Sequence, residues 1–310
     1  MAIVKPQDIL VGIDPVQDFA PALAWATDEA RRRVRGLRLV VAVPPEHDTQ
    51  HVDDAPRYMA QRLEAARLLR TAVEWVAERE PEVRAGSAVL DGFPAGVLVG
   101  LSKGADMAVL GSRRLGRFAE FLSAGSVALP VTARAHCPVV VVPARETREE
   151  DLAEPEGAPV PHLVAGVDGS ESARVALGLA FEEAALRGCE LRVVAVWQRP
   201  VFSPRTRESG FRSEFRMLGE VTDSWARKYP EVRIVREVLA GSPVEVLADV
   251  AEDASALLVG RRGSGGYGGM RMGSVTYGLL HRARCPVITV PPTPASTRDA
   301  PTTRSGTGSD

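Results

Sequence analysis

The amino-acid sequence predicts an α/β protein of two tandem, doubly wound domains, each with a five-stranded parallel sheet in the order 3-2-1-4-5. Three observations predict this fold class. The 310 residues are about twice the length of an ordinary domain. Blocks of the first half return in the same order in the second half. Within each half, short apolar runs alternate with segments of helical periodicity, which is typical of a parallel sheet with right-handed crossovers.

The internal repeat is carried by five pairs of blocks. The pairs are DILVGIDP and HLVAGVDG, LRLVVAV and LRVVAV, DGFPAGVL and AGSPVEVL, MAVLGSRR and LLVGRRG, and AHCPVVVVP and ARCPVITVP. Asp168 lies 154 residues after Asp14, whereas Cys285 lies 148 residues after Cys137, so the copies differ by small insertions and deletions. We place the domains at 3–144 and 161–292, a charged linker at 145–160, and a Ser/Thr/Gly/Pro-rich tail, expected to be disordered, at 293–310.

The second copy shows each expected element in order. Apolar, β-branched runs predict strands at 162–167, 191–197, 232–239, 256–260 and 286–290. Helical periodicity predicts helices at 172–188, 211–229, 243–253 and 273–283. Gly188 is expected as a C-cap, and Ser242 to Glu245 as a capping box with Pro243 at the first helical position. The near-continuous apolar runs VVVV and LLVG predict strands buried on both faces.

Ligands of an open parallel sheet bind beyond the carboxyl ends of its strands, where the winding reverses direction. In the second copy this point lies between Asp168-Gly169-Ser170, after the first strand, and the loop 260–274, after the fourth. The loop reads GRRGSGGYGGMRMGS. Its glycines let backbone N–H groups approach a ligand, and the helix that starts at Gly273-Ser274 adds unpaired donors and a positive dipole end.

This loop predicts an anion cradle suited to phosphate. Ser274 adds a hydroxyl donor, and three arginines can neutralise charge: Arg261, Arg262 and Arg271. A flexible surface loop is the alternative interpretation, but the position opposite Asp168 favours a nucleotide site. The loop is not a Walker A motif, because no Gly-Lys-Ser/Thr ends it.

The spacing of the loop resembles a known pattern. Gly260, Gly263 and the Gly273-Ser274 pair are separated by two and nine residues, which is similar to the ATP-binding motif G-2x-G-9x-G-[S/T] of the universal stress proteins. The runs VDGS and CPVITVP also resemble that family's first and last strands, and the resemblance covers nearly all of 3–143 and 160–292. It implies a Rossmann-like fold of the adenine nucleotide alpha hydrolase type and ATP as ligand, with Mg²⁺ held by the phosphates.

The resemblance also implies a role for each matching residue. Asp168 would bind the adenine or ribose end, Val196 would pack on the base, and the glycines would let the chain approach the phosphates. Together with Arg261, the nucleotide-binding set is Asp168, Val196, Gly260, Arg261, Gly263, Gly273, Ser274 and Val275.

The first copy departs from the pattern. A candidate second nucleotide site keeps Asp14, Val43, Gly111, Gly125 and Ser126. However, Arg114 stands where the second glycine belongs, and the loop is one residue longer, with bulky side chains at Leu115, Phe118, Phe121 and Leu122. The loop could fill its own pocket, or it could bind an anion through Arg113, Arg114 and Arg117, so both alternatives stay open beside nucleotide binding.

The last strands, at 138–142 and 286–290, are short, apolar and at the sheet edge. In the family that the chain resembles, this strand pairs two domains about a two-fold axis. The resemblance therefore implies that the two copies pair through these residues, and a homodimer of the whole chain is also open. Cys137 and Cys285, at matching positions, are expected in small buried slots.

Composition narrows the function classes. A net charge of -2 gives no electrostatic reason to expect nucleic acid or an anionic membrane surface as a partner. The three cysteines indicate a reducing compartment, and the N-terminus lacks a signal-peptide pattern, so we expect a cytoplasmic protein. The apolar stretches are too short to span a bilayer, and the five histidines show no metal-ligand spacing.

We therefore expect a stress-response regulatory protein that binds ATP, mainly in the second domain, and switches conformation or partner contacts. No catalytic triad or paired carboxylate is visible in the sequence, so ATP hydrolysis is expected to be slow at most. Two alternatives from other classes stay open. One is an ATP-dependent enzyme, such as a slow ATPase or a nucleotidyl transferase, and the other is an ATP-independent scaffold.

Overall fold

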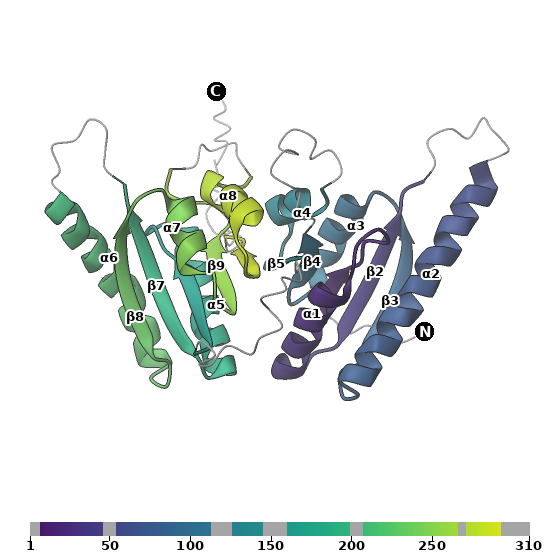
Figure 1. The fold of residues 1–310 in the computed structure, drawn as a ribbon, viewed down its shortest axis with the longest axis horizontal. Coiled ribbons are helices and arrows are strands. Elements are labelled where there is room, and N and C mark those ends of the chain that lie inside the picture. The colour runs from purple at the N-terminus through teal and green to yellow at the C-terminus, as the bar shows by residue number, and fades with distance from the viewer. Residues whose placement is uncertain are drawn as a thin grey trace, which may run out of the picture.

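The computed structural model describes residues 7–45, 54–112, 126–144, 160–198, 207–265 and 271–292. The ten strands of these residues form one sheet in the order β3-β2-β1-β4-β5-β10-β9-β6-β7-β8 (Figure 1). Each half thus has the order 3-2-1-4-5, and the predicted fold class is confirmed. The strands are β1 (Ile9–Gly12), β2 (Leu37–Val43), β3 (Ala85–Asp91), β4 (Ala108–Ser112), β5 (Val139–Pro143), β6 (His162–Gly166), β7 (Glu190–Trp197), β8 (Ile234–Ala240), β9 (Ala256–Gly260) and β10 (Val287–Val290).

Helices cover both faces of the sheet. They are α1 (Ala20–Arg33), α2 (Asp54–Arg79), α3 (Pro94–Leu101), α4 (Ala128–Arg134), α5 (Glu171–Arg187), α6 (Arg207–Lys228), α7 (Pro243–Val250) and α8 (Ser274–Arg282), with a 3-10 turn η1 (Ser102–Gly104) after α3. One face carries α1, α2, α5 and α6 over a continuous core. The other face carries α3 and α4 over one core and α7 and α8 over another.

The apolar run of β5 is divided between these two faces. Val140 and Val142 pack into the core under α1 and α5, whereas Val139 and Val141 pack into the core under α3 and α4. A strand covered on both faces needs apolar side chains at successive positions, which explains the run VVVV.

The two halves are joined edge to edge by β5 and β10. These strands pair antiparallel, with Val141 opposite Val287, Val140 opposite Ile288 and Val139 opposite Thr289, while the pairings within each half are parallel. The Thr289 hydroxyl donates to the Val139 carbonyl at 3.2 Å. Because each strand covers the other's edge, neither presents an unpaired ladder at this junction.

Local signals set the ends of α5. The Ser170 hydroxyl accepts a hydrogen bond from the Ala173 N–H at 3.2 Å, which caps the first turn. The helix ends at Arg187, and Gly188, which has a φ of 60°, follows as the predicted C-cap.

The start of α7 follows the prediction only in part. The helix begins at Pro243, as expected for proline at the first helical position. The Ser242 side chain makes no capping hydrogen bond, however, so the predicted capping box is wrong in its side-chain contact. The helix ends at Val250, three residues earlier than expected.

Two predicted segments fall mostly or wholly outside the described part of the chain. These are the linker, of which only residue 160 is described, and the tail at 293–310. Within the described ranges, no helix combines the length and apolar character that a membrane crossing requires.

Candidate functional site

The switch point of the second domain brings two loops together. β6 pairs in parallel with β9, so the loops that leave their carboxyl ends lie side by side. Asp168, which follows β6, joins these loops through its carboxylate: Oδ1 accepts from the Ser170 N–H at 3.1 Å and Oδ2 accepts from the Ser264 N–H at 2.7 Å. The side chain therefore holds the loop after β9 against the loop after β6.

Gly263 makes room for this contact. A Cβ at Gly263 would lie 2.7 Å from Asp168 Oδ2, which is closer than a carbon can approach without displacing the carboxylate. Glycine thus lets the two predicted site residues touch. The spacing pattern alone did not show that the partner of Gly263 is Asp168.

Gly260 is required for a different reason. A Cβ at this position would lie 2.6 Å from the Ser172 carbonyl carbon and 2.7 Å from the Ala173 nitrogen, both in the first turn of α5. The start of α5 therefore rests directly on the end of β9. The Ser172 hydroxyl lies at the same junction, where it accepts from the Arg262 N–H at 3.4 Å.

The start of α8 completes the arrangement. Gly273 precedes the helix, and its N–H donates to the Arg261 carbonyl at 2.9 Å. Thr276, in the first turn, donates its hydroxyl to the Gly260 carbonyl at 2.9 Å and ties the helix to β9. Ser274 is exposed and Val275 half-buried at the first two helical positions. The N-terminal end of α8, with its positive dipole, is thus held beside Gly260 and Gly263.

Two members of the predicted set lie differently from the rest. The Arg261 guanidinium points toward the first domain, where Nη1 donates to the Ala135 carbonyl at 2.7 Å. Burial, with the nearby charges of Arg262 and Arg271, lowers the pKa of Arg261. Val196 lies near the end of β7, half-buried against the core under α7 and α8. The structure therefore brings together Asp168, Gly260, Gly263, Gly273 and the start of α8, but directs Arg261 to the domain junction.

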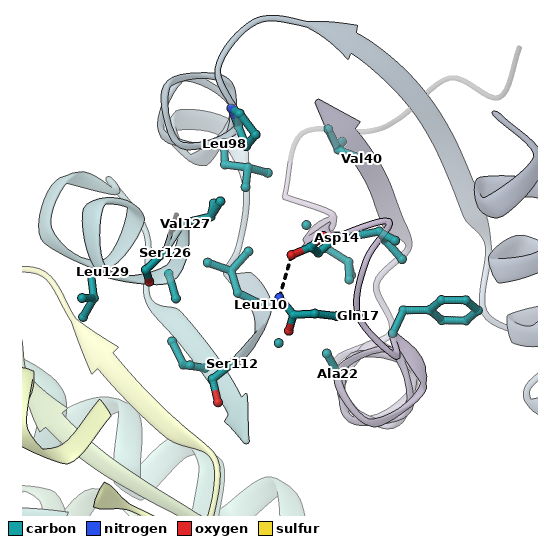
Figure 2. A pocket seen from close by; sticks show the side chains of 18 of the residues that line it. Asp14, Gln17, Ala22, Val40, Leu98, Leu110, Ser112, Ser126, Val127 and Leu129 are labelled. Atoms are coloured by element: carbon teal, nitrogen blue, oxygen red, sulfur yellow. Dashed lines mark hydrogen bonds between the residues drawn. The ribbon is translucent and has the colours of Figure 1, made fainter. Parts of the chain in front are cut away.

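The equivalent position of the first domain contains a cavity of about 320 Å³. Asp14, Gly111 and Ser126 of the candidate second site line it, and Gly125 lies outside the described residues. The Asp14 carboxylate accepts from the Val16 N–H at 3.0 Å and from the Gln17 side-chain amide at 2.6 Å (Figure 2). Val43 is buried in the core under α1 and α2.

Several residues that line this cavity were not identified from the sequence. Gln17 lies next to Asp14, and Leu280 and His281 reach the cavity from α8 of the second domain. No repeat or motif marks Leu280 and His281, because their position depends on how the two halves meet. The arginines and bulky residues expected between Arg113 and Leu122 fall in the undescribed range 113–125.

The remaining candidate chemistry is structural. Cys137 and Cys285 are buried, as predicted, and burial raises the pKa of each thiol to about 12. Within the described ranges, no group of three or more His, Cys, Asp and Glu side chains is placed to hold a metal ion.

Comparison with known proteins gives one consistent result. The family model described as "Universal stress protein family" matches residues 6–143 and 160–291. One universal stress protein of Mycobacterium tuberculosis is 34% identical over 293 residues, which cover 90% of this chain and 95% of the relative. Another from the same species is 31% identical over 292 residues, which cover 92% and 97%.

A solved structure shares the fold over almost the whole chain. A universal stress protein from Archaeoglobus fulgidus aligns with a TM-score of 0.67 at 17% sequence identity, covering 93% of this chain and 97% of that chain. The arrangement of both halves is therefore found in an experimentally determined structure.

Proposed function

This chain belongs to the universal stress protein family, and on that premise we propose that its second domain binds ATP as a regulatory ligand. The observation that supports this most is the contact between Asp168 and the loop of Gly263, at the point where the sheet reverses its winding. The glycine spacing that resembles the family's ATP-binding motif lies in this loop.

The proposed roles follow from the positions of the groups. Asp168 accepts hydrogen bonds from the ribose or the adenine amine, and Val196 packs toward the base. Gly260, Gly263 and Gly273 admit the phosphates, which Ser274 and Val275 meet with backbone N–H groups and a hydroxyl at the positive end of α8. Mg²⁺ is carried by the phosphates and water, as is usual for this ion with nucleotides.

The proposed switch uses a competition for Asp168. In the described state its Oδ2 accepts from the Ser264 N–H, so a ribose hydroxyl that binds the same oxygen displaces Ser264. The freed loop connects within three residues to Arg261, which is bonded to Ala135 of the other domain. Nucleotide binding would thereby change the contact between the domains and the surface offered to partners, either another protein or a second copy of this chain.

The alternatives differ in what they require. An ATP-dependent enzyme needs a base or a lysine beside the phosphates, and the loop 260–274 supplies arginines and hydroxyls instead. A regulatory module that hydrolyses ATP slowly at most fits this side-chain set better. Its proposed setting, the cytoplasm during a stress response, rests on the family resemblance. A scaffold would have no nucleotide affinity at all.

Calorimetric titration with Mg-ATP separates these functions. We expect saturable binding to the wild-type chain and roughly 10- to 100-fold weaker binding to Asp168→Ala, the size expected for loss of a hydrogen bond to a charged group. Asp14→Ala, the matching residue of the first domain, is the control and should retain the second-domain affinity. Multiple-turnover ADP release above about one per second would favour the enzyme, and no saturable binding would favour the scaffold.

A further inference from the structure

We propose that the groove between α5 and α6 of the second domain binds a short peptide with free ends, its amine toward Glu171 and Glu220 and its carboxylate toward Lys228. None of the residues that line this groove belongs to the proposed nucleotide-binding set, so the two sites are separate. Three features of the groove support the proposal: its apolar floor, the opposite charges at its two ends, and the lack of the ion pairs that tie the matching helices of the first domain together.

The groove is a cavity of about 560 Å³ with an apolar floor, a volume within the range of small-molecule pockets. Val175 and Leu179 of α5 and Trp225 of α6 supply this floor. A Cβ at Gly178 would lie 2.6 Å from Trp225 Cζ2, so the glycine lets the indole lie directly against α5. Tyr229 stacks beside Trp225, with 6.3 Å between the ring centroids.

The two ends of the groove carry charges of opposite sign. Glu220 lies eight residues before Lys228, which is about 12 Å along a helix. Because α5 and α6 each connect parallel strands, both run from the same edge of the sheet, so Glu171 in the first turn of α5 lies far from Lys228 at the end of α6. Among the described residues, these three charged side chains form no ion pair.

The other charged groups of the groove leave this polarity in place. Glu182 accepts from Arg33 of the first domain, with 3.0 Å from Nη1 to Oε1, so its charge is neutralised. Arg174 Nε donates to the Gly169 carbonyl at 3.4 Å, beside the start of α5, and its charge offsets one of the two carboxylates at that end. The end at α5's first turn therefore has a net negative charge, and the end at Lys228 has a net positive charge.

A short, extended peptide with free ends matches this arrangement. At neutral pH its amine is positively charged and its carboxylate negatively charged. Three to four extended residues span about 10–14 Å, which is close to the separation of Glu220 and Lys228 along α6. Apolar side chains in the middle of the peptide would cover the exposed surface of Val175, Leu179 and Trp225.

The first domain shows how the same place can be closed by the chain itself. Two ion pairs tie α1 to the end of α2 there, Arg79 to Asp28 and Arg31 to Glu80, each at 3.2 Å. The matching positions of the second domain hold, in the same order, Lys228, Glu182, Ala185 and Tyr229. In the part of the chain that the structure describes, no ion pair ties α5 to α6, because Glu182 pairs across the domain junction and Ala185 and Tyr229 are uncharged.

Calorimetric titration of the full chain with the tetrapeptide Ala-Leu-Leu-Ala tests the proposal. We expect saturable binding of the free peptide, and binding weaker by roughly threefold or more when its carboxylate is amidated or its amine acetylated, since each change removes one partly exposed charge contact. No saturable binding of the free peptide, or equal affinity for the free and the capped peptides, would overturn the proposal.

Two variants assign the peptide ends to the residues. Lys228→Met should abolish the difference between the free and the amidated peptide and keep the effect of acetylation, whereas Glu220→Gln should reduce the effect of acetylation and keep that of amidation. Arg227→Met is the control, because Arg227 is an exposed neighbour of Lys228 that does not line the groove. Unchanged discrimination in Lys228→Met, or its loss in Arg227→Met, contradicts the proposed site.

Discussion

Arg187 of α5 and Glu29 of α1 form an ion pair between the two domains, with 2.6 Å from Nη2 to Oε2. Its counterpart joins Arg33 to Glu183, and within each helix the arginine also pairs with the glutamate four residues before it. Glu183 and Arg187 each lie 154 residues after Glu29 and Arg33, so the repeat encodes both halves of this quartet. Both glutamate side chains are fully buried and the two arginines almost so.

Removing one charge of the quartet should destabilise the chain strongly. Glu183→Ala leaves two nearly buried guanidinium groups with Glu29 as their one remaining shared carboxylate, and we expect a loss of about 3–5 kcal/mol in the free energy of unfolding. Urea denaturation measures it. Glu208→Ala is the control, because Glu208 pairs with Arg212 on an exposed face of α6, where a pair contributes about 0–1 kcal/mol. Equal losses in the free energy of unfolding of both variants would show that the buried quartet stabilises the chain no more than an exposed ion pair does.

Val34 is strained where the other copy has glycine. It ends α1 with a φ of 53°, the conformation that Gly188 adopts at the end of α5, and its side chain is 88% exposed. A β-branched residue in this region costs roughly 1–2 kcal/mol, so Val34→Gly should raise the free energy of unfolding by about 1 kcal/mol. Val16→Gly, also at an exposed valine but without positive φ, should give no such gain in urea denaturation.

The two copies should differ in their response to alanine at the matching glycines of the fourth strands, Gly111 in β4 and Gly260 in β9. Gly260→Ala places a methyl group against the α5 backbone, so we expect a loss of about 1–3 kcal/mol in stability. A methyl group at Gly111 would make only ordinary van der Waals contacts, at 3.7 Å to Gln17 Oε1 and 3.9 Å to the Ala22 Cβ, so Gly111→Ala should be near neutral. Thermal or urea unfolding of both variants checks the contrast, and a costly Gly111→Ala would argue against the open cavity.

The buried thiols should be almost unreactive in the folded chain. Burial raises the pKa of Cys137 and Cys285 to about 12, so at pH 8 very little of either is thiolate. A disulfide reagent should modify both only on unfolding. Because the folded chain holds these protons more tightly than the unfolded chain, their contribution to stability falls as the pH rises from 9.0 toward about 12. Rapid modification of either residue at pH 8 would contradict the burial.

Much of the fold could be predicted because local patterns determine it. The apolar runs of β5 and β9 mark strands buried on both faces, and Gly188 and Pro243 mark helix ends through their own backbone chemistry. In the second domain, Gly263 and Asp168 were singled out by residue type, position and glycine spacing, and the structure places them in contact.

The remaining features depend on contacts between distant segments. The direction of Arg261 depends on the Ala135 carbonyl, 126 residues away, and the wall at Leu280 depends on the pairing of β5 with β10. Pro21, in the first turn of α1, is a local signal that this helix starts later than α5. The signal can be recognised only by comparison with Val175, at the matching position of the other copy.

The central claim is that ATP binds the second domain at the contact between Asp168 and Gly263. Calorimetric titration of Mg-ATP into the Gly263→Val chain, with the Gly265→Val chain as the control, tests it most directly. A Cβ at position 263 would lie 2.7 Å from Asp168 Oδ2, whereas a Cβ at position 265 would have no atom within 4 Å. We predict that Gly263→Val weakens binding by roughly 100-fold or more, while Gly265→Val retains the wild-type affinity. Wild-type affinity in a folded Gly263→Val chain would contradict the proposed site.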